Sequence, residues 1–552
     1  MTRSLPVVPI LTGSDDVAAG ASTSRLLGAD RASDLAAVVA LIVAYAVLDR
    51  GTRAIAAIGV TDLRRLSLVA AALTNRRWVV LAATATAGAV AALRPGRMLI
   101  EWSSLEHGRA LRWLAGSLIV VLAWPSALYD YNWLADRTHG FDRALVVVLA
   151  AAAITRPAFL VPFVIVVRVV NEQFVFPFGT TAARNVDDLL LMILLVIAAA
   201  HLLFVVTGRN RTASVVLLIT AALAAHFFIP GKGKLSIGWV SAGDLANLPL
   251  SSYTAGWLGH TSGRWAEVLA GFYERFRLPI MAGTLMLEVG AIVAVVHPRL
   301  TRLWLPGLVV FHVMTFATTG FWFVPWIALE VGLFTILSLP SLRSWVVENA
   351  TPARGLLALA CVAGAPFLFH PPGLAWLDAP VSSGYEIEGI GMSGTEYHIA
   401  AAAFAPLSHH VAFDRLQLGP TVAATGAYGA VTTTAHLAAL EQITEVDELK
   451  AFEATLAPPT GTALSQQFLM TFLEHAAHRH STNWFGLATP EHFWTSRPEP
   501  SYRFQEPLRE LAVFRVRAIH HNGDPVRERQ LVLTLTMDDL GRAVVTSEGD
   551  GS

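Results

Sequence analysis

Long stretches without charged residues recur along this 552-residue chain, and most of them approach the length of a membrane-spanning helix. A helix needs about 20 residues to cross the hydrocarbon core of a bilayer. Apolar residues make up 54% of the chain and charged residues only 15%, which is typical of a membrane protein. The pattern therefore predicts a polytopic α-helical membrane domain. The stretches cover residues 35–48, 78–93, 113–129, 189–206, 212–229, 278–296, 303–319, 321–342 and 355–369.

One further region, residues 144–167, is long enough to cross a membrane but has Arg156 and Pro157 at its centre. A lipid-facing arginine at that depth is costly, and proline cannot continue the hydrogen-bond ladder of a helix. We therefore predict a broken or re-entrant helix that is buried among its neighbours. With this region, the chain is expected to have about ten membrane segments.

The distribution of arginine predicts the orientation of these segments. Six arginines stand between the first two apolar stretches, within residues 50–77, and cytoplasmic loops of membrane proteins are rich in Lys and Arg. Counting stretches from that loop puts residues 230–277 on the outer face, together with everything after about residue 377. With its bias toward alanine and arginine, the chain is expected to lie in a bacterial plasma membrane as a multi-pass protein.

The composition changes near residue 377, where a soluble, extracytoplasmic C-terminal domain is predicted. Residues 385–399, YEIEGIGMSGTEYHI, alternate in polarity and contain glycines, which indicates a β-hairpin. Helical patterns near 435–456 and 462–479 precede a second predicted hairpin, within residues 510–537. The chain is therefore divided into an N-terminal segment (1–34), a membrane domain (35–377) and an α+β or mainly β domain (378–552).

Several functional classes have no support in the sequence. The formal net charge is −1, so no basic excess points to nucleic acid. No P-loop, nucleophile elbow or dinucleotide fingerprint is present. Glu474 and His478 stand four residues apart, a spacing that can hold a metal, but a solvated helix end accounts for them better and no metal is expected.

The segment FFIPGKGKLSIGW, residues 227–239, holds two of only three lysines in the chain, Lys232 and Lys234. Its proline and glycines predict that the preceding helix ends here, which would put an amine on unwound backbone at the outer membrane boundary. A buried lysine can lose its proton near neutral pH and act as a general base. Lys234 is thus a candidate base, and Trp239 is of a residue type that favours the interface. The alternative is a glycine-rich loop with two flexible cations.

Two further ionisable residues, Glu288 and His312, lie within successive apolar stretches. Because a carboxylate at bilayer depth is costly, each is expected to face the interior of the bundle with a partner. A structural pair that only fixes helix packing is an equally good interpretation. Glu330 and His226 raise the same question, and Arg156 is a candidate counter-ion.

These residues together resemble a known family. Lys234, Leu235 and Trp239 of KLSIGW, followed by Phe311 and His312 of FHVMTFATTGFWFVPW, match in order and spacing the membrane domain of vitamin K-dependent gamma-glutamyl carboxylase. That domain and its bacterial relatives are called the horizontally transferred transmembrane domain. The resemblance covers about residues 35–340, and the C-terminal domain also looks like the carboxylase arrangement.

The resemblance implies an activity and a set of site residues. The lysine at position 234 would deprotonate reduced vitamin K or menaquinone, whose reaction with dioxygen creates the base that lets a substrate glutamate accept carbon dioxide. Lys234, Glu288 and His312 are then expected to be catalytic. Trp239, His226 and Arg156 are expected to bind the cofactor. The substrate would be a secreted protein or peptide that is reached from the outer membrane face.

The chain also departs from the family pattern. Asn185 matches, but Asp187 and Asp188 stand where a histidine is expected, and a single cysteine, Cys361, excludes an intramolecular disulfide. These differences leave two alternatives open. The chain could be a non-carboxylating relative that helps secreted proteins or peptides to mature. It could also be a transporter with Arg156, Glu288 and His312 along a polar path.

Overall fold

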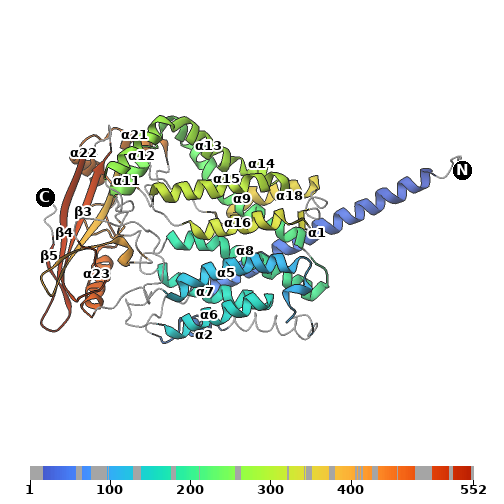
Figure 1. The fold of residues 1–552 in the computed structure, drawn as a ribbon, viewed down its shortest axis with the longest axis horizontal. Coiled ribbons are helices and arrows are strands. Elements are labelled where there is room, and N and C mark those ends of the chain that lie inside the picture. The colour runs from blue at the N-terminus through green and yellow to red at the C-terminus, as the bar shows by residue number, and fades with distance from the viewer. Residues whose placement is uncertain are drawn as a thin grey trace, which may run out of the picture.

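A bundle of long helices forms most of the molecule, and a β-sheet with its own helices covers one end of that bundle (Figure 1). The computed structural model describes residues 16–57, 65–75, 77, 96, 99–128, 139–175, 182–210, 212–254, 263–319, 323–340, 342–343, 351–371, 379–404, 407, 411, 415–425, 433–456, 458–478, 500–520 and 526–548. The predicted stretch 78–93 lies outside these residues.

Six helices of the described part are long and apolar enough to cross a membrane. By length and composition they are compatible with a membrane domain, although six is fewer than the expected ten. α16 (Val324–Ser338) and α18 (Pro352–Ala363) are apolar but shorter, and α19 (Ala365–Leu368) follows α18. The six come from α1 (Asp16–Ala56), α5 (Gly108–Leu128), α8 (Ala182–Thr207), α9 (Thr212–Ser236), α13 (Arg277–Val289) with α14 (Ala291–Ala294), and α15 (Pro298–Thr319).

The region around Arg156 is broken, as expected, and its two halves form a helical hairpin. α6 (Gly140–Thr155) ends before Arg156, a single 3-10 turn covers Pro157–Phe159, and α7 (Leu160–Val175) returns beside α6 (Figure 1). Arg156 is half-buried at this turn, and its guanidinium donates to the carbonyl of Leu99. The expectation that Arg156 serves as counter-ion for Glu288 or His312 is therefore wrong.

The division of this region into two helices changes which segments share an end of the bundle. Arg53 donates to Asp188 at 2.8 Å, close to the start of α8. Since α9 returns alongside α8 after a short connection, its last residues also lie near the start of α8 (Figure 1). Arg53 and Lys234 thus occupy the same end of the bundle, whereas the count from the sequence put their segments on opposite faces. Arg209, which follows α8, lies at the other end.

Helix α9 continues through Pro230, Gly231 and Gly233, so the prediction that the helix ends before the lysines is wrong. A proline inside a helix removes one hydrogen bond, and apolar surroundings offer the rest of the backbone no better partners than the helix itself. The helix ends at Ser236, followed by Gly238 with φ of 70°. Lys234 therefore stands in the last helical turn rather than on unwound backbone.

The C-terminal domain contains a five-stranded antiparallel sheet in the order β2-β1-β3-β4-β5. Both predicted hairpins are confirmed, as β1–β2 and β3–β4. Its helices α21 (Thr434–Glu441), α22 (Val446–Ala454) and α23 (Thr462–Ala477) lie near the predicted positions, so the domain is α+β. The strands are β1 (Val381–Gly391), β2 (Glu396–Ile399), β3 (Leu508–Ile519), β4 (Val526–Met537) and β5 (Ala543–Glu548).

Side chains that alternate along the strands bury one face of this sheet. Ile387 of β1 pairs with Val513 of β3, and both pack against Phe472 of α23. Glu474 of the same helix accepts a hydrogen bond from the backbone of Ala543 at 3.1 Å. Within the described ranges no three His, Cys, Asp or Glu side chains form a group that could hold a metal. The hydrogen bond between Glu474 and Ala543 helps to hold α23 against β5.

Candidate functional site

Two buried pairs of an acid and a base lie where α9, α13, α15 and α16 meet. Lys234 of α9 contacts Glu288 of α13, and His312 of α15 contacts Glu330 of α16. The expectation that Glu288 and His312 each have a partner in the bundle interior is confirmed. Each pair joins neighbouring helices, so both can fix helix packing as well as take part in chemistry.

The Lys234–Glu288 pair is almost fully enclosed. The Lys234 ammonium donates to Oε1 of Glu288, and the two side chains are only 8% and 5% exposed. The other oxygen of Glu288, Oε2, has no hydrogen-bond partner among the described residues. Lys232, two residues earlier on the same helix, is exposed instead. The two lysines that look alike in the sequence thus have different surroundings.

Gly231 permits the approach of α9 to α13 that brings this pair together. A Cβ atom at Gly231 would lie 2.8 Å from the Cβ of Glu288 and 3.2 Å from the backbone nitrogen of Val289. Neither neighbour can move without displacing α13. The glycine that we expected to end the helix therefore serves close helix packing.

Trp239 covers the amine of Lys234. Gly238 adopts a left-handed conformation that ends α9 and turns the chain back, which glycine does at little cost. The Lys234 nitrogen then lies 5.0 Å from the centre of the Trp239 ring. Trp239 is itself buried against Tyr273 and Met281. The Lys-to-Trp spacing seen in the sequence thus corresponds to a turn that closes over the lysine.

The His312–Glu330 pair is enclosed by aromatic rings. Nδ1 of His312 lies 3.0 Å from Oε1 of Glu330, and the two side chains are 2% and 0% exposed. Phe323 stacks on the imidazole with ring centres 4.8 Å apart. Trp326 meets the same imidazole edge-on at 5.5 Å. A dry, apolar environment therefore surrounds this acid–base contact.

Phe227 and Trp304 connect the two pairs. The Phe227 ring lies 5.5 Å from the ring of His312 and 5.6 Å from that of Trp304. The Trp304 indole donates at 2.8 Å to the carbonyl of Leu287, the residue before Glu288. The two acid–base contacts thus belong to one region of the bundle.

The predicted site residues fall into three groups. Lys234, Glu288 and Trp239 come together directly, and His312 joins them through Phe227. His226 is buried and meets the edge of Trp326 at 5.9 Å, while its Nδ1 lies 2.8 Å from the carbonyl of Ala222. Arg156 lies outside the site.

Sequence reasoning did not predict the roles of Phe227, Trp304 and Trp326. The seven-residue spacing of Trp304 and Phe311 on one helix was a signal that could have indicated an aromatic face.

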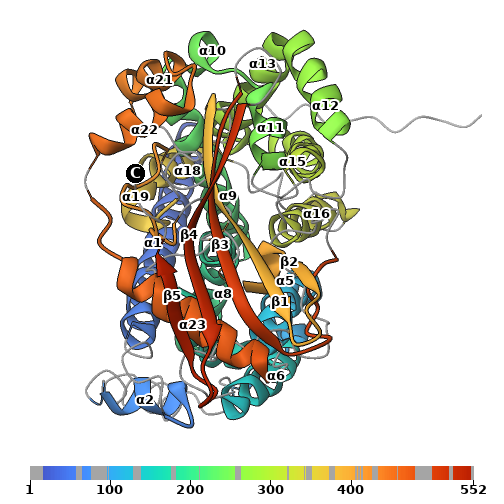
Figure 2. The same ribbon diagram turned by 90° about the vertical axis from the view of Figure 1, so that its left-hand side faces the viewer.

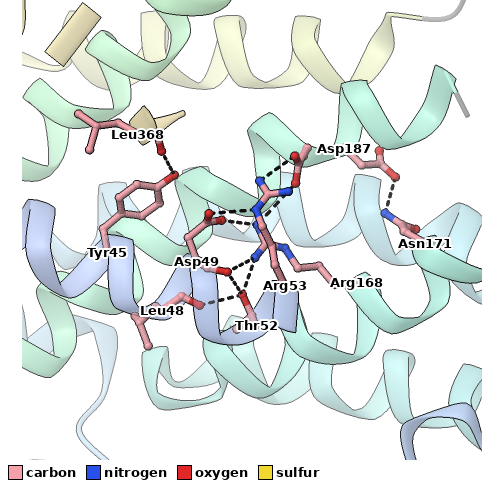
Figure 3. Close-up of polar contacts among 10 residues, drawn as sticks. Tyr45, Leu48, Asp49, Thr52, Arg53, Arg168, Asn171, Asp187 and Leu368 are labelled. Atoms are coloured by element: carbon pink, nitrogen blue, oxygen red, sulfur yellow. Dashed lines mark hydrogen bonds and ion pairs between the residues drawn. The ribbon is translucent and has the colours of Figure 1, made fainter. Parts of the chain in front are cut away.

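A separate ion cluster lies among α1, α7 and α8 (Figure 3). Arg168 contacts Oδ1 of Asp49 at 2.6 Å, and Arg53 contacts the other oxygen of Asp49 at 2.9 Å and Asp188 at 2.8 Å. Asp187 accepts from the amide of Asn171 at 3.1 Å. The two aspartates that replace the expected histidine are therefore engaged in contacts between helices.

A small pocket lies at the other end of α9, away from both pairs. Its volume is about 50 Å³, and Val216, Thr301 and Gly355 are among the residues that line it. It contains none of the predicted site residues.

Substituting Gly231 tests the close contact of α9 and α13. We expect Gly231→Ala to lower the free energy of unfolding by about 1–3 kcal/mol, because overpacking must separate the helices. A Cβ atom at Gly283, also in α13, would meet nothing within 4 Å, so Gly283→Ala should be neutral or slightly stabilising. Denaturant titration in detergent micelles gives both values, and equal effects of the two substitutions would refute the role of Gly231.

No family model, no curated protein and no solved structure matches this chain. The family resemblance thus rests on the residues quoted above.

Proposed function

We propose that this chain is an integral membrane enzyme of the carboxylase type, in which Lys234 accepts a proton from a lipid quinol and a substrate is then modified at the outer membrane face. The observation that supports the proposal is the buried contact of Lys234 with Glu288 under the ring of Trp239. A buried lysine does not contribute a surface charge, and the exposed Lys232 already provides such a charge. A surface charge therefore does not explain Lys234.

Each residue of the pair has a part in this proposal. Burial penalises separated charges, so the proton of the Lys234 ammonium can pass to Glu288 and leave a neutral amine as the base. Trp239 excludes water from that amine. Glu288 then holds the proton. Its second oxygen, Oε2, accepts no hydrogen bond from any other described residue.

The surroundings are suited to a quinol such as reduced menaquinone or vitamin K. When bound, the quinol supplies an acidic hydroxyl group and reducing equivalents for dioxygen. Phe227, Phe323 and Trp326 pack around His312, so an aromatic head group would have to enter beside these rings. In this proposal His312 and Glu330 would orient a second polar group of the same ring system. His226 would then support the aromatic cluster through Trp326 rather than bind the quinol.

We further propose that about ten segments cross a bacterial plasma membrane, with the sheet domain outside. Positive charge is the basis for this orientation. Short connections at the end of the bundle away from the sheet have arginines, including Arg209, Arg299 and Arg302, whereas the arginines near Arg53 lie at the sheet end and do not follow the rule. The sheet domain would then be available to bind a secreted protein or peptide, the expected substrate.

Labelled bicarbonate provides the test of carboxylation. Purified protein in lipid, with reduced menaquinone or vitamin K and a glutamate-containing peptide, should incorporate label into the peptide. Lys234→Arg keeps the charge but removes a base that can titrate, so we expect incorporation to fall by at least about 100-fold. Lys232→Arg is the matched control, and it should retain incorporation.

Two results would count against the proposal. Equal incorporation by the Lys234→Arg and Lys232→Arg proteins would remove Lys234 from the chemistry. Folded protein that shows no turnover with any peptide would favour the non-carboxylating alternative, in which the chain assists the maturation of secreted proteins.

A further inference from the structure

Helix α12 (Gly263–Arg275) has an apolar face that no other part of the described protein covers. Trp265, Val268 and Phe272 are 47%, 54% and 44% exposed, and Phe276 directly after the helix is 42% exposed. With about 100° of rotation per residue, these four side chains fall within a sector of about 80°. The helix is only 13 residues long and was not among the predicted membrane segments.

Another side of α12 packs against the rest of the protein. Ala266 and Ala270 are buried against Leu250 of α11 (Asn247–Thr254). Tyr273 is buried, and its hydroxyl lies 2.5 Å from that of Thr318 in α15. Tyr273 belongs to the same small buried cluster as Trp239, the residue that covers Lys234. One side of α12 is thus fixed to the bundle.

A third side of α12 is charged. Arg264, Glu267, Glu274 and Arg275 are all exposed. The same rotation places them in a sector of about 100° that overlaps neither the buried side nor the apolar side. The helix therefore meets three environments, namely protein, an apolar phase and water.

The position of α12 identifies the apolar phase. The helix lies at the outer edge of the bundle, at the end where the sheet domain is attached (Figures 1 and 2). Its apolar face continues through Phe276 into the exposed side of α13, where Leu278 is 64% and Met286 is 71% exposed. α13 belongs to one of the apolar helices long enough to cross a membrane, so this side of α13 faces lipid.

We propose that α12 lies in the plane of the membrane surface and binds the boundary between lipid head groups and acyl chains through Trp265, Val268 and Phe272. Tryptophan and phenylalanine on one face with charges beside them are the composition of such interfacial helices. This contact rests only on the membrane location of the chain and not on the proposed chemistry. It gives the cap formed by Tyr273 and Trp239 a direct connection to the bilayer surface.

Spin labels provide the test, because the one native cysteine, Cys361, is buried. Single cysteines are introduced by Val268→Cys and Phe272→Cys on the apolar face and by Glu267→Cys and Glu274→Cys on the charged face. Leu303→Cys provides a lipid reference and Ser547→Cys a water reference, since both positions are exposed. The protein without a new cysteine reports any labelling of Cys361. All are placed in vesicles of phosphatidylethanolamine and phosphatidylglycerol.

Power saturation then compares the access of oxygen, which concentrates in lipid, with that of a water-soluble nickel chelate. Labels at positions 268 and 272 should favour oxygen as at position 303, and labels at 267 and 274 should favour the chelate as at 547. Chelate access at 268 and 272 equal to that at 547 would overturn the proposal, since the face would lie in water. Exclusion of both reagents at 268 and 272 would also overturn it, since protein would cover the face.

Discussion

Replacing Lys234 by methionine is expected to lower the free energy of unfolding by about 3–5 kcal/mol, because it leaves a buried carboxylate without its partner. Glu288 is 4% exposed, so water cannot replace the ammonium. The double substitution Lys234→Met with Glu288→Met should recover most of this loss, since two apolar side chains of similar volume replace the pair. Reversible unfolding in mixed micelles measures these two variants and Glu288→Met alone.

The matched control for this prediction is Lys232→Met, at an exposed position on the same helix, which should change the stability by less than about 0.5 kcal/mol. Additive effects of the two substitutions in the double variant would contradict the pairing. They would mean that Lys234 and Glu288 stabilise the bundle independently.

Loss of Arg168 should also destabilise the protein, at the ion cluster of α1, α7 and α8. Arg168 is 4% exposed and contacts both the carboxylate of Asp49, at 2.6 Å, and its backbone carbonyl, at 3.0 Å. Arg168→Met removes hydrogen bonds of a charged group but leaves Asp49 with Arg53 as its cation, so we expect a loss of about 1.5–3 kcal/mol in unfolding free energy. Unfolding under the same conditions as for Lys234→Met gives the value.

Arg50→Met serves as the comparison, because Arg50 is exposed on the same helix as Asp49 and should contribute less than about 0.5 kcal/mol. If Arg168→Met proved as mild as Arg50→Met, the cluster would not hold these helices together. Neither substitution touches Lys234 or Glu288, so any surviving activity remains measurable.

The parts of the fold that the sequence predicted depend on residues that are close together along the chain. The two hairpins of the sheet domain follow from alternation within short segments, and α23 follows from a helical pattern of apolar residues. α9 shows the limit of this reasoning. Its proline and glycines are local signals for a helix end, but packing against α13 and the absence of water in an apolar environment outweigh them.

Long-range relations were less accessible. Glu288 lies 54 positions after Lys234, and no periodicity connects the two. The placing of residues 50–77 and 230–277 on opposite faces failed for a related reason, since it depended on a single crossing by the segment at Arg156. The sequence around Arg156 predicts a break in the helix. Packing against the neighbouring helices decides whether the chain turns back after the break or continues in the same direction.

The most direct test of the account is whether Lys234 acts as a base toward a lipid quinol. Protein in lipid vesicles is supplied with reduced vitamin K and dioxygen, without peptide or bicarbonate, and formation of the quinone epoxide is followed by chromatography. The account predicts epoxide with the unaltered chain and with Lys232→Arg, and at least about 100-fold less with Lys234→Arg. Epoxide formation by Lys234→Arg at the unaltered rate, or none by any of the three folded proteins, would contradict it.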